Sequence, residues 1–62
     1  MNFIRIQNTV INPDKILSFY LEDERIEFVM LGGEEISISL DSEEDAKTVF
    51  ENVLNALIAK NN

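Results

Sequence analysis

The stretch that decides the fold is "ILSFYLEDERIEFVMLGGEEISISL", residues 16–40. It contains three runs in which large apolar side chains alternate with other residues, a period of two that is typical of half-buried β-strands. The polar segment of residues 22–25 and the glycine-containing segment of residues 32–34 separate these runs. The sequence therefore predicts an antiparallel meander of three long strands.

The register of the first turn can be tested on the side chains themselves. Glu22 placed opposite Arg25 gives an ion pair across the turn. The same register places Leu21 opposite Ile26, Phe19 opposite Phe28 and Leu17 opposite Met30 on one face, and Tyr20 opposite Glu27 on the other. Because cross-strand neighbours share a face, this agreement favours the register.

The second turn contains Gly32 and Gly33. A two-residue loop there would send the apolar residues of its two strands to opposite faces. A loop of Gly32, Gly33 and Glu34 repairs this, because it pairs Met30 with Ile36, Phe28 with Ile38 and Ile26 with Leu40. We therefore predict a three-residue loop or a glycine bulge. The glycines are not directly followed by a helix and have no lysine nearby, so we assign them no phosphate or other ligand.

The run "DSEEDAKTVFENVLNALIAK", residues 41–60, predicts an amphipathic helix. Its apolar residues recur at helical spacing: Ala46, Val49, Phe50, Val53, Leu54, Leu57 and Ile58. Asp41, with Glu44 three residues on, approximates a capping box, and Ser42 is the alternative N-cap. We expect the helix to pack on the sheet face built from Leu17, Phe19, Leu21, Ile26, Phe28, Met30, Ile36, Ile38 and Leu40.

The N-terminal run "FIRIQNTVIN", residues 3–12, fits two paths. Either the chain turns at Gln7 and Asn8, or one strand runs on through Val10. Asn12 followed by Pro13 predicts a single helical turn, because asparagine is a good N-cap and proline suits the first helical position. The predicted fold is α+β, a single domain of residues 1–62. It is an antiparallel meander of three to five strands with one C-terminal amphipathic helix packed on one face.

The outer face of the predicted sheet carries an apolar patch made of Ile16, Tyr20, Val29 and Leu31. A contiguous patch often marks an interface, so these four are the candidate interface residues. Self-association through the patch or a sheet edge is one explanation, giving a homodimer or a higher oligomer. The others are that the N-terminal strand, with Phe3 and Ile6, covers the patch, or that a different protein does.

The charge balance limits the classes of molecule that the chain is expected to bind. Twelve acidic residues face five basic ones, for a net charge of −7. Such a surface repels phosphate backbones and anionic membranes, so we expect no direct nucleic-acid binding and no membrane binding. The acidic residues are expected to act as solubilising groups. The alternative is that they mimic a nucleic acid and block a DNA- or RNA-binding protein.

The residues that common active sites need are missing. With no histidine and no cysteine, the usual nucleophile–base pairs and the commonest metal ligands are absent, so we expect no enzyme, no cofactor and no metal. Arg5, Tyr20 and Arg25 are the few side chains suited to a small anion. Residues 1–6 do not resemble a signal peptide, no apolar run is long enough to span a membrane, and no disulfide can form. A cytoplasmic location is therefore expected.

The run "FIRIQNTVINPDKILSFY", followed by a glycine hairpin and an acidic-capped helix, resembles small uncharacterised bacterial and phage proteins. More distantly, "INPDKILSFYLED" is similar to the strand-entry segment of LytTR-type and PH-like domains. LytTR-type domains bind DNA through basic residues that this chain lacks, so that function does not follow. The sequence predicts a small non-enzymatic, self-associating interaction module, of the kind that regulatory proteins and phage-encoded inhibitors represent.

Overall fold

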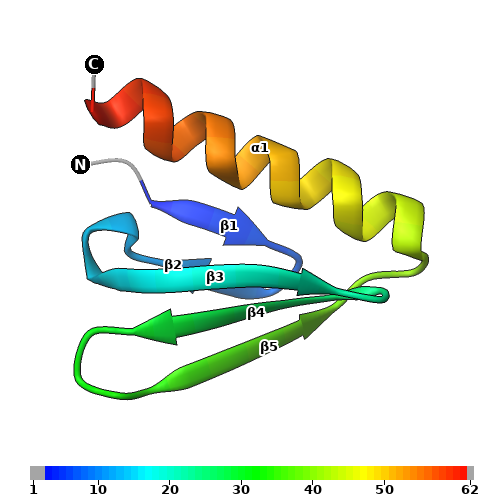
Figure 1. The fold of residues 1–62 in the computed structure, drawn as a ribbon, viewed down its shortest axis with the longest axis horizontal. Coiled ribbons are helices and arrows are strands. Elements are labelled where there is room, and N and C mark those ends of the chain that lie inside the picture. The colour runs from blue at the N-terminus through cyan, green and yellow to red at the C-terminus, as the bar shows by residue number, and fades with distance from the viewer. Residues whose placement is uncertain (1–2, 62) are drawn as a thin grey trace.

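A computed structural model describes residues 3–61 of the chain (Figure 1). The elements are β1 (Ile4–Ile6), β2 (Thr9–Ile11), a 3-10 turn (Pro13–Lys15), β3 (Ile16–Glu22), β4 (Arg25–Met30), β5 (Glu35–Ser39) and α1 (Glu43–Asn61). The strands form a two-stranded sheet, β1–β2, and a three-stranded sheet, β3–β4–β5, all antiparallel. The predicted α+β fold with one C-terminal helix is confirmed.

The N-terminal segment follows the first of its two predicted paths. It turns at Gln7 and Asn8, so that Ile6 pairs with Thr9, and the single strand running through Val10 is wrong. Gln7 takes a φ of 55° to close this turn. The predicted helical turn is confirmed as a 3-10 turn, in which the Asn12 side chain accepts a hydrogen bond of 3.0 Å from the Asp14 amide.

The register of β3 on β4 is confirmed from Ser18–Val29 to Glu22–Arg25, and it changes at the start of β3. Ile16, not Leu17, lies opposite Met30, and a bulge at Leu17 separates this pair from the rest. The predicted Leu17–Met30 pair is therefore wrong.

The bulge at Leu17 has a physical cause. Ile16 and Phe19 both pack against the buried core. They are an odd number of residues apart, so a regular strand would send them to opposite faces, and one extra residue brings both to the same face. The preceding 3-10 turn holds Ile16 there, because the Ile16 amide donates to the Pro13 carbonyl.

The glycine turn has a three-residue loop, as predicted, but the loop starts one residue earlier. Residues 31–33 form it, and Met30 accepts a hydrogen bond of 3.0 Å from the Gly33 amide and donates one of 2.8 Å to the Glu34 carbonyl. Phe28 therefore pairs with Ile36 and Ile26 with Ile38, not with Ile38 and Leu40. This register differs from the predicted one by two residues, so the same side chains still face the core.

The glycines explain the shift of that register. Gly32 and Gly33 have φ values of 98° and 95°, which place glycine at both loop positions that need a left-handed backbone. In the predicted loop the last of these positions would have been Glu34. A side chain is strained in that conformation, so the chain selects the register in which glycine occupies it.

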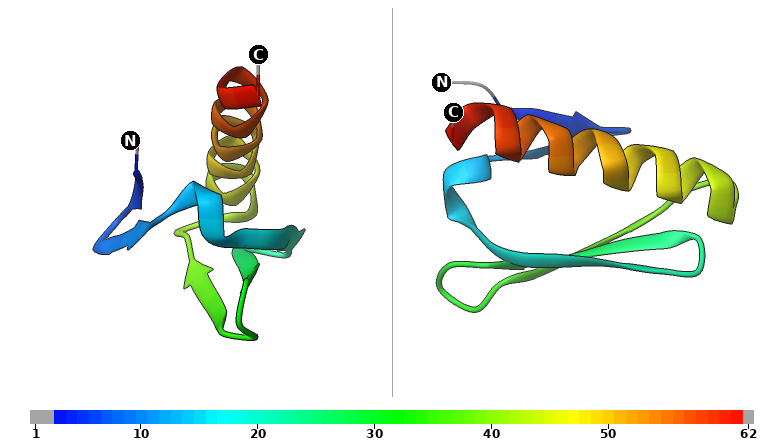
Figure 2. Two further views of the ribbon diagram at one scale, coloured as in Figure 1. Left: turned by 90° about the vertical axis from the view of Figure 1, so that its left-hand side faces the viewer. Right: turned by 45° about the horizontal axis from the view of Figure 1, so that its top comes forward.

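The helix begins directly after Ser42, so the alternative N-cap is the one that the chain uses, in place of Asp41. The Ser42 hydroxyl accepts a hydrogen bond of 3.0 Å from the Asp45 amide. The β1–β2 hairpin lies beside α1, and both help to enclose one core (Figure 2). That core comprises Ile6, Ile11, Ile26, Phe28, Met30, Ile38, Ala46 and Val53. Among residues 3–61, no helix is both long and apolar enough to cross a membrane.

Three members of the predicted apolar faces remain in contact with solvent. Leu17 is 65% exposed, Leu21 37% and Ile58 51%. Leu17 is exposed because of the bulge, and Leu21 lies at the end of β3 beside the turn. The assignment of Leu17 and Leu21 to the buried face is therefore wrong for Leu17 and only partly right for Leu21.

Candidate interaction surface

Exposed apolar side chains gather along β3. Leu17, Tyr20 and Leu21 belong to this strand and are 65%, 51% and 37% exposed. Leu31 is 52% exposed and lies beside the start of β3, because its amide donates a 2.7 Å hydrogen bond to the carbonyl of Lys15, the residue before that strand. We call these four residues the β3 strip. Tyr20 and Leu21 are neighbours on one strand and lie on opposite sides of the sheet, so the β3 strip follows the edge of the sheet and not one face.

Two of the four predicted interface residues belong to the β3 strip, namely Tyr20 and Leu31. Val29 lies on the outer face as predicted, opposite Ser18, and is half-buried. Ile16 is the exception, because it packs against the core opposite Met30, so its predicted place on the outer face is wrong.

Sequence reasoning missed Leu17 and Leu21 as surface residues. Their alternation with Ser18 and Tyr20 is that of a regular half-buried strand, and this pattern contains no sign of a bulge. The odd spacing between Ile16 and Phe19, both large and apolar, is the one feature of the sequence from which the bulge could have been inferred.

The N-terminal strand does not cover the outer face. Ile6 is buried in the core with α1 and the inner face of the sheet, and Phe3 is 56% exposed. The amide of the Gln7 side chain donates a 3.0 Å hydrogen bond to the Ser39 carbonyl, which ties the β1–β2 turn to the end of β5. The explanation in which Phe3 and Ile6 fold over the patch is therefore wrong.

The β3 strip lies on an unpaired sheet edge. Within the described residues β3 pairs with β4 alone, so its second edge is open. Glu22 and Arg25 flank a two-residue loop, so their backbones form a hydrogen-bonded pair. In an antiparallel ladder, pairs with backbone hydrogen bonds alternate with pairs that have none. Tyr20 consequently bonds to β4, whereas the amides and carbonyls of Phe19 and Leu21 point to the open edge.

Polar side chains on the outer face, near the β3–β4 turn, form hydrogen bonds with one another. Arg25 donates to Glu27 at 3.1 Å and to Glu22 at 2.8 Å, and Ser37 donates to the same Glu27 oxygen at 2.9 Å. The hydrogen bonds to Glu27 and then to Glu22 raise the pKa of Arg25. Arg25 is therefore already bonded to two acidic side chains of β3 and β4, one of which is its predicted partner Glu22. It is a poor candidate for binding an anion.

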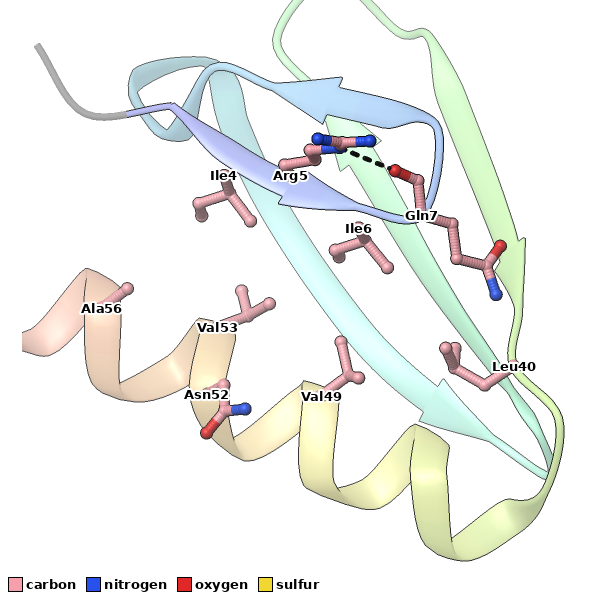
Figure 3. A pocket seen from close by; sticks show the side chains of 9 residues that line it. All are labelled: Ile4, Arg5, Ile6, Gln7, Leu40, Val49, Asn52, Val53 and Ala56. Carbon is pink, nitrogen blue, oxygen red and sulfur yellow. Dashed lines mark hydrogen bonds between the residues drawn. The ribbon is translucent and has the colours of Figure 1, made fainter.

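A shallow groove of about 290 Å³ lies between β1 and α1 (Figure 3). Ile4 and Ile6 point into it from β1, and Val49 and Val53 face them from the helix. The Arg5 side chain points away from the helix, and its Nε donates to the Gln7 carbonyl at 3.0 Å. The groove walls are therefore mainly apolar, and the arginine does not supply a charge inside it.

Seven of the twelve acidic residues gather at one end of the molecule, which we call the acidic end. They are Glu22, Asp23, Glu24, Asp41, Glu43, Glu44 and Asp45. The β3–β4 turn and the start of α1 meet there, since the Leu40 amide donates to the Glu24 carbonyl at 2.8 Å (Figure 1). A depression at this end is lined by Asp23, Glu43 and Glu44, with Leu21 and Lys47.

The described part of the chain holds no group of three or more side chains placed to bind a metal ion.

Comparison with protein-family models, with curated proteins and with solved structures finds no match. The resemblance to LytTR-type and PH-like domains therefore stays a prediction.

Proposed function

We propose that this protein is a non-enzymatic interaction module that associates with further copies of itself through the β3 strip. The observation that carries the proposal is the exposure of Leu17, Tyr20 and Leu31, each more than half exposed, on or beside a strand whose second edge is open. Single exposed apolar side chains are ordinary, but several of them along an open sheet edge are typical of an interface.

The size of the domain also supports association. A chain of 62 residues without disulfides supports only a small core, and oligomerisation is a common way to stabilise such a chain. Fully burying a leucine contributes about 1.5–3 kcal/mol. Leu17 keeps 65% of its surface in solvent, so covering it contributes about 1–2 kcal/mol to association in each copy.

Sedimentation of the purified chain tests this proposal. We expect the wild type to associate as its concentration rises to the high micromolar range. Tyr20→Glu and Leu31→Glu should each weaken association by about tenfold or more, which is about 1.4 kcal/mol, and leave the circular dichroism spectrum unchanged. Ser39→Glu is the matched control, because Ser39 is exposed on the same face but on β5. A wild type that stays monomeric at high micromolar concentration contradicts the proposal.

A second candidate is an acidic nucleic-acid mimic that blocks a DNA- or RNA-binding protein. The observation that favours it is the acidic end, where two segments distant in sequence bring carboxylates together. Clustered negative charge attracts the basic groove of a nucleic-acid-binding protein.

Competition for DNA separates this candidate from the first. The wild type should release host DNA-binding proteins from a DNA column, and the Glu43→Gln/Glu44→Gln variant should do so less well. The control is Glu34→Gln/Glu35→Gln, which removes the same charge beside the glycine loop, at the other end of the sheet. Equal competition by the two variants, or none by the wild type, would count against the mimic.

A further inference from the structure

We infer that two copies pair their β3 strands antiparallel about a two-fold axis at Tyr20, so that two three-stranded sheets become one six-stranded sheet. This inference rests on the proposed self-association and specifies its geometry. Four features of the chain lead to it: the composition of the two sheet edges, the direction of the free backbone groups, the position of the charges and the register that these allow.

The first feature is the contrast between the two edges of the three-stranded sheet. β5 forms one edge, and its exposed side chains are Glu35, Ser37 and Ser39. β3 forms the other edge, and it carries no charge before its last residue, Glu22. Charged and polar side chains protect edge strands from pairing, and an apolar edge invites it. Pairing through β3 is therefore favoured over pairing through β5.

The second feature is the backbone of β3. The amides and carbonyls of Phe19 and Leu21 point to the open edge, where no other described element takes them up. An added antiparallel strand would satisfy these groups and extend the ladder. A second copy of β3 offers the same groups with the same spacing, so it is a self-complementary partner for this edge.

The third feature is the placement of the charges. β3 ends at Glu22, and Asp23 and Glu24 follow in the turn at the acidic end; the strand begins directly after Lys15. Parallel pairing would place two acidic ends side by side, which is unfavourable for copies that each carry a net charge of −7. Antiparallel pairing moves the acidic ends to opposite ends of the dimer and brings Lys15 of each copy towards the acidic end of the other.

The fourth feature is the register. Outward-pointing residues must face outward-pointing residues if they are to exchange hydrogen bonds. An axis at Tyr20 satisfies this condition, because Phe19 of each copy then faces Leu21 of the other, and the amides and carbonyls of both residues point to the open edge. Tyr20 then faces Tyr20 of the other copy, so these two exposed side chains cover each other, and Ser18 faces Glu22. The bulge at Leu17 limits the paired segment to about residues 18–22, so we expect a weak, reversible dimer.

Engineered cysteines test this register, because the natural chain has no cysteine. A Ser18→Cys/Glu22→Cys variant should form a disulfide-linked dimer on mild oxidation, since cross-strand neighbours of a non-bonded pair lie about 4.5 Å apart between Cα atoms. Within one strand these positions are about 13 Å apart, so they cannot link to each other. The single variants Ser18→Cys and Glu22→Cys are the matched controls, and neither should dimerise covalently to a comparable extent.

Amide hydrogen exchange of the unmodified chain provides a second test that removes no apolar contact. The amide of Phe19 should become protected as concentration rises, whereas that of Tyr20, already bonded to β4, should be protected throughout. The cross-linked dimer together with this protection supports the inference. Association of the wild type without either result overturns the β3 pairing and leaves the proposed self-association standing. A wild type that is monomeric at high micromolar concentration overturns both.

Discussion

Leu17→Ala is the substitution that tests the bulge most directly. Replacing leucine with alanine removes about three methylene equivalents, each contributing about 0.8 kcal/mol when fully buried. Leu17 is 65% exposed, so only about a third of that contribution is present, and we expect a loss of about 0.8 kcal/mol. Because Leu17 fills no buried space, there is no additional cavity cost.

Leu21→Ala is the matched comparison, since it makes the same chemical change four residues further along the same strand. Leu21 is 37% exposed, and the same reasoning gives a loss of about 1.5 kcal/mol. Ile38, which is 4% exposed, provides the buried reference, where substitution by alanine costs about 2–5 kcal/mol. A chain of this length has a total stability of about 3–9 kcal/mol, so Ile38→Ala removes a large share of it.

Urea denaturation followed by circular dichroism measures these three values. The samples should be dilute, because an associated state would add the burial of Leu17 between copies to the apparent stability. We expect the losses in free energy of unfolding to rise from Leu17 to Leu21 to Ile38. If Leu17→Ala costs as much as Ile38→Ala, then Leu17 is a core residue, β3 is regular, and the account of the bulge is refuted. Repeating the Leu17→Ala measurement at high concentration should give a larger loss if copies associate through the β3 strip.

Three further predictions concern the helix cap, the glycine loop and the charge. Ser42→Ala should lower the free energy of unfolding by about 1 kcal/mol, because the Asp45 amide loses its acceptor, and urea denaturation will show whether it does. Gly33→Ala should cost about 1–2 kcal/mol through backbone strain alone, since no atom lies within 4 Å of the added methyl group; an equal loss in the control Glu34→Ala would contradict this assignment. Added salt should strengthen self-association measured by sedimentation, because it screens the repulsion between copies of net charge −7, and weakening instead would indicate an interface held by ion pairs.

Much of the fold could be predicted because it depends on local patterns. The β3–β4 register follows from matching apolar residues to one face, and it is correct wherever the strand is regular. The 3-10 turn at Pro13 and the cap at Ser42 follow from hydrogen bonds between residues close in sequence. The face of β5 that is buried was also predictable, because a two-residue error in register leaves it unchanged.

The candidate surface was harder to predict because a single residue of register changes it. Tyr20 and Leu31 could be identified as exposed from alternation alone. Leu17 and Ile16 exchange roles at the bulge, and alternation by itself assigns both to the wrong side. The position of the β1–β2 hairpin beside α1 could not be inferred from the residues of the hairpin, because it depends on which apolar surface remains after the helix has docked.

The sequence by itself determined the three-stranded meander and the C-terminal helix, the faces that β4 and β5 bury, the strong negative charge and the absence of histidine and cysteine. The tertiary structure alone decided that Ile16 turns inward and Leu17 outward, that the N-terminal hairpin leaves the outer face open, and that seven carboxylates share one end. The reason is physical. Local patterns act over a few residues, whereas the bulge and the open edge of β3 result from packing segments distant in sequence around one small core.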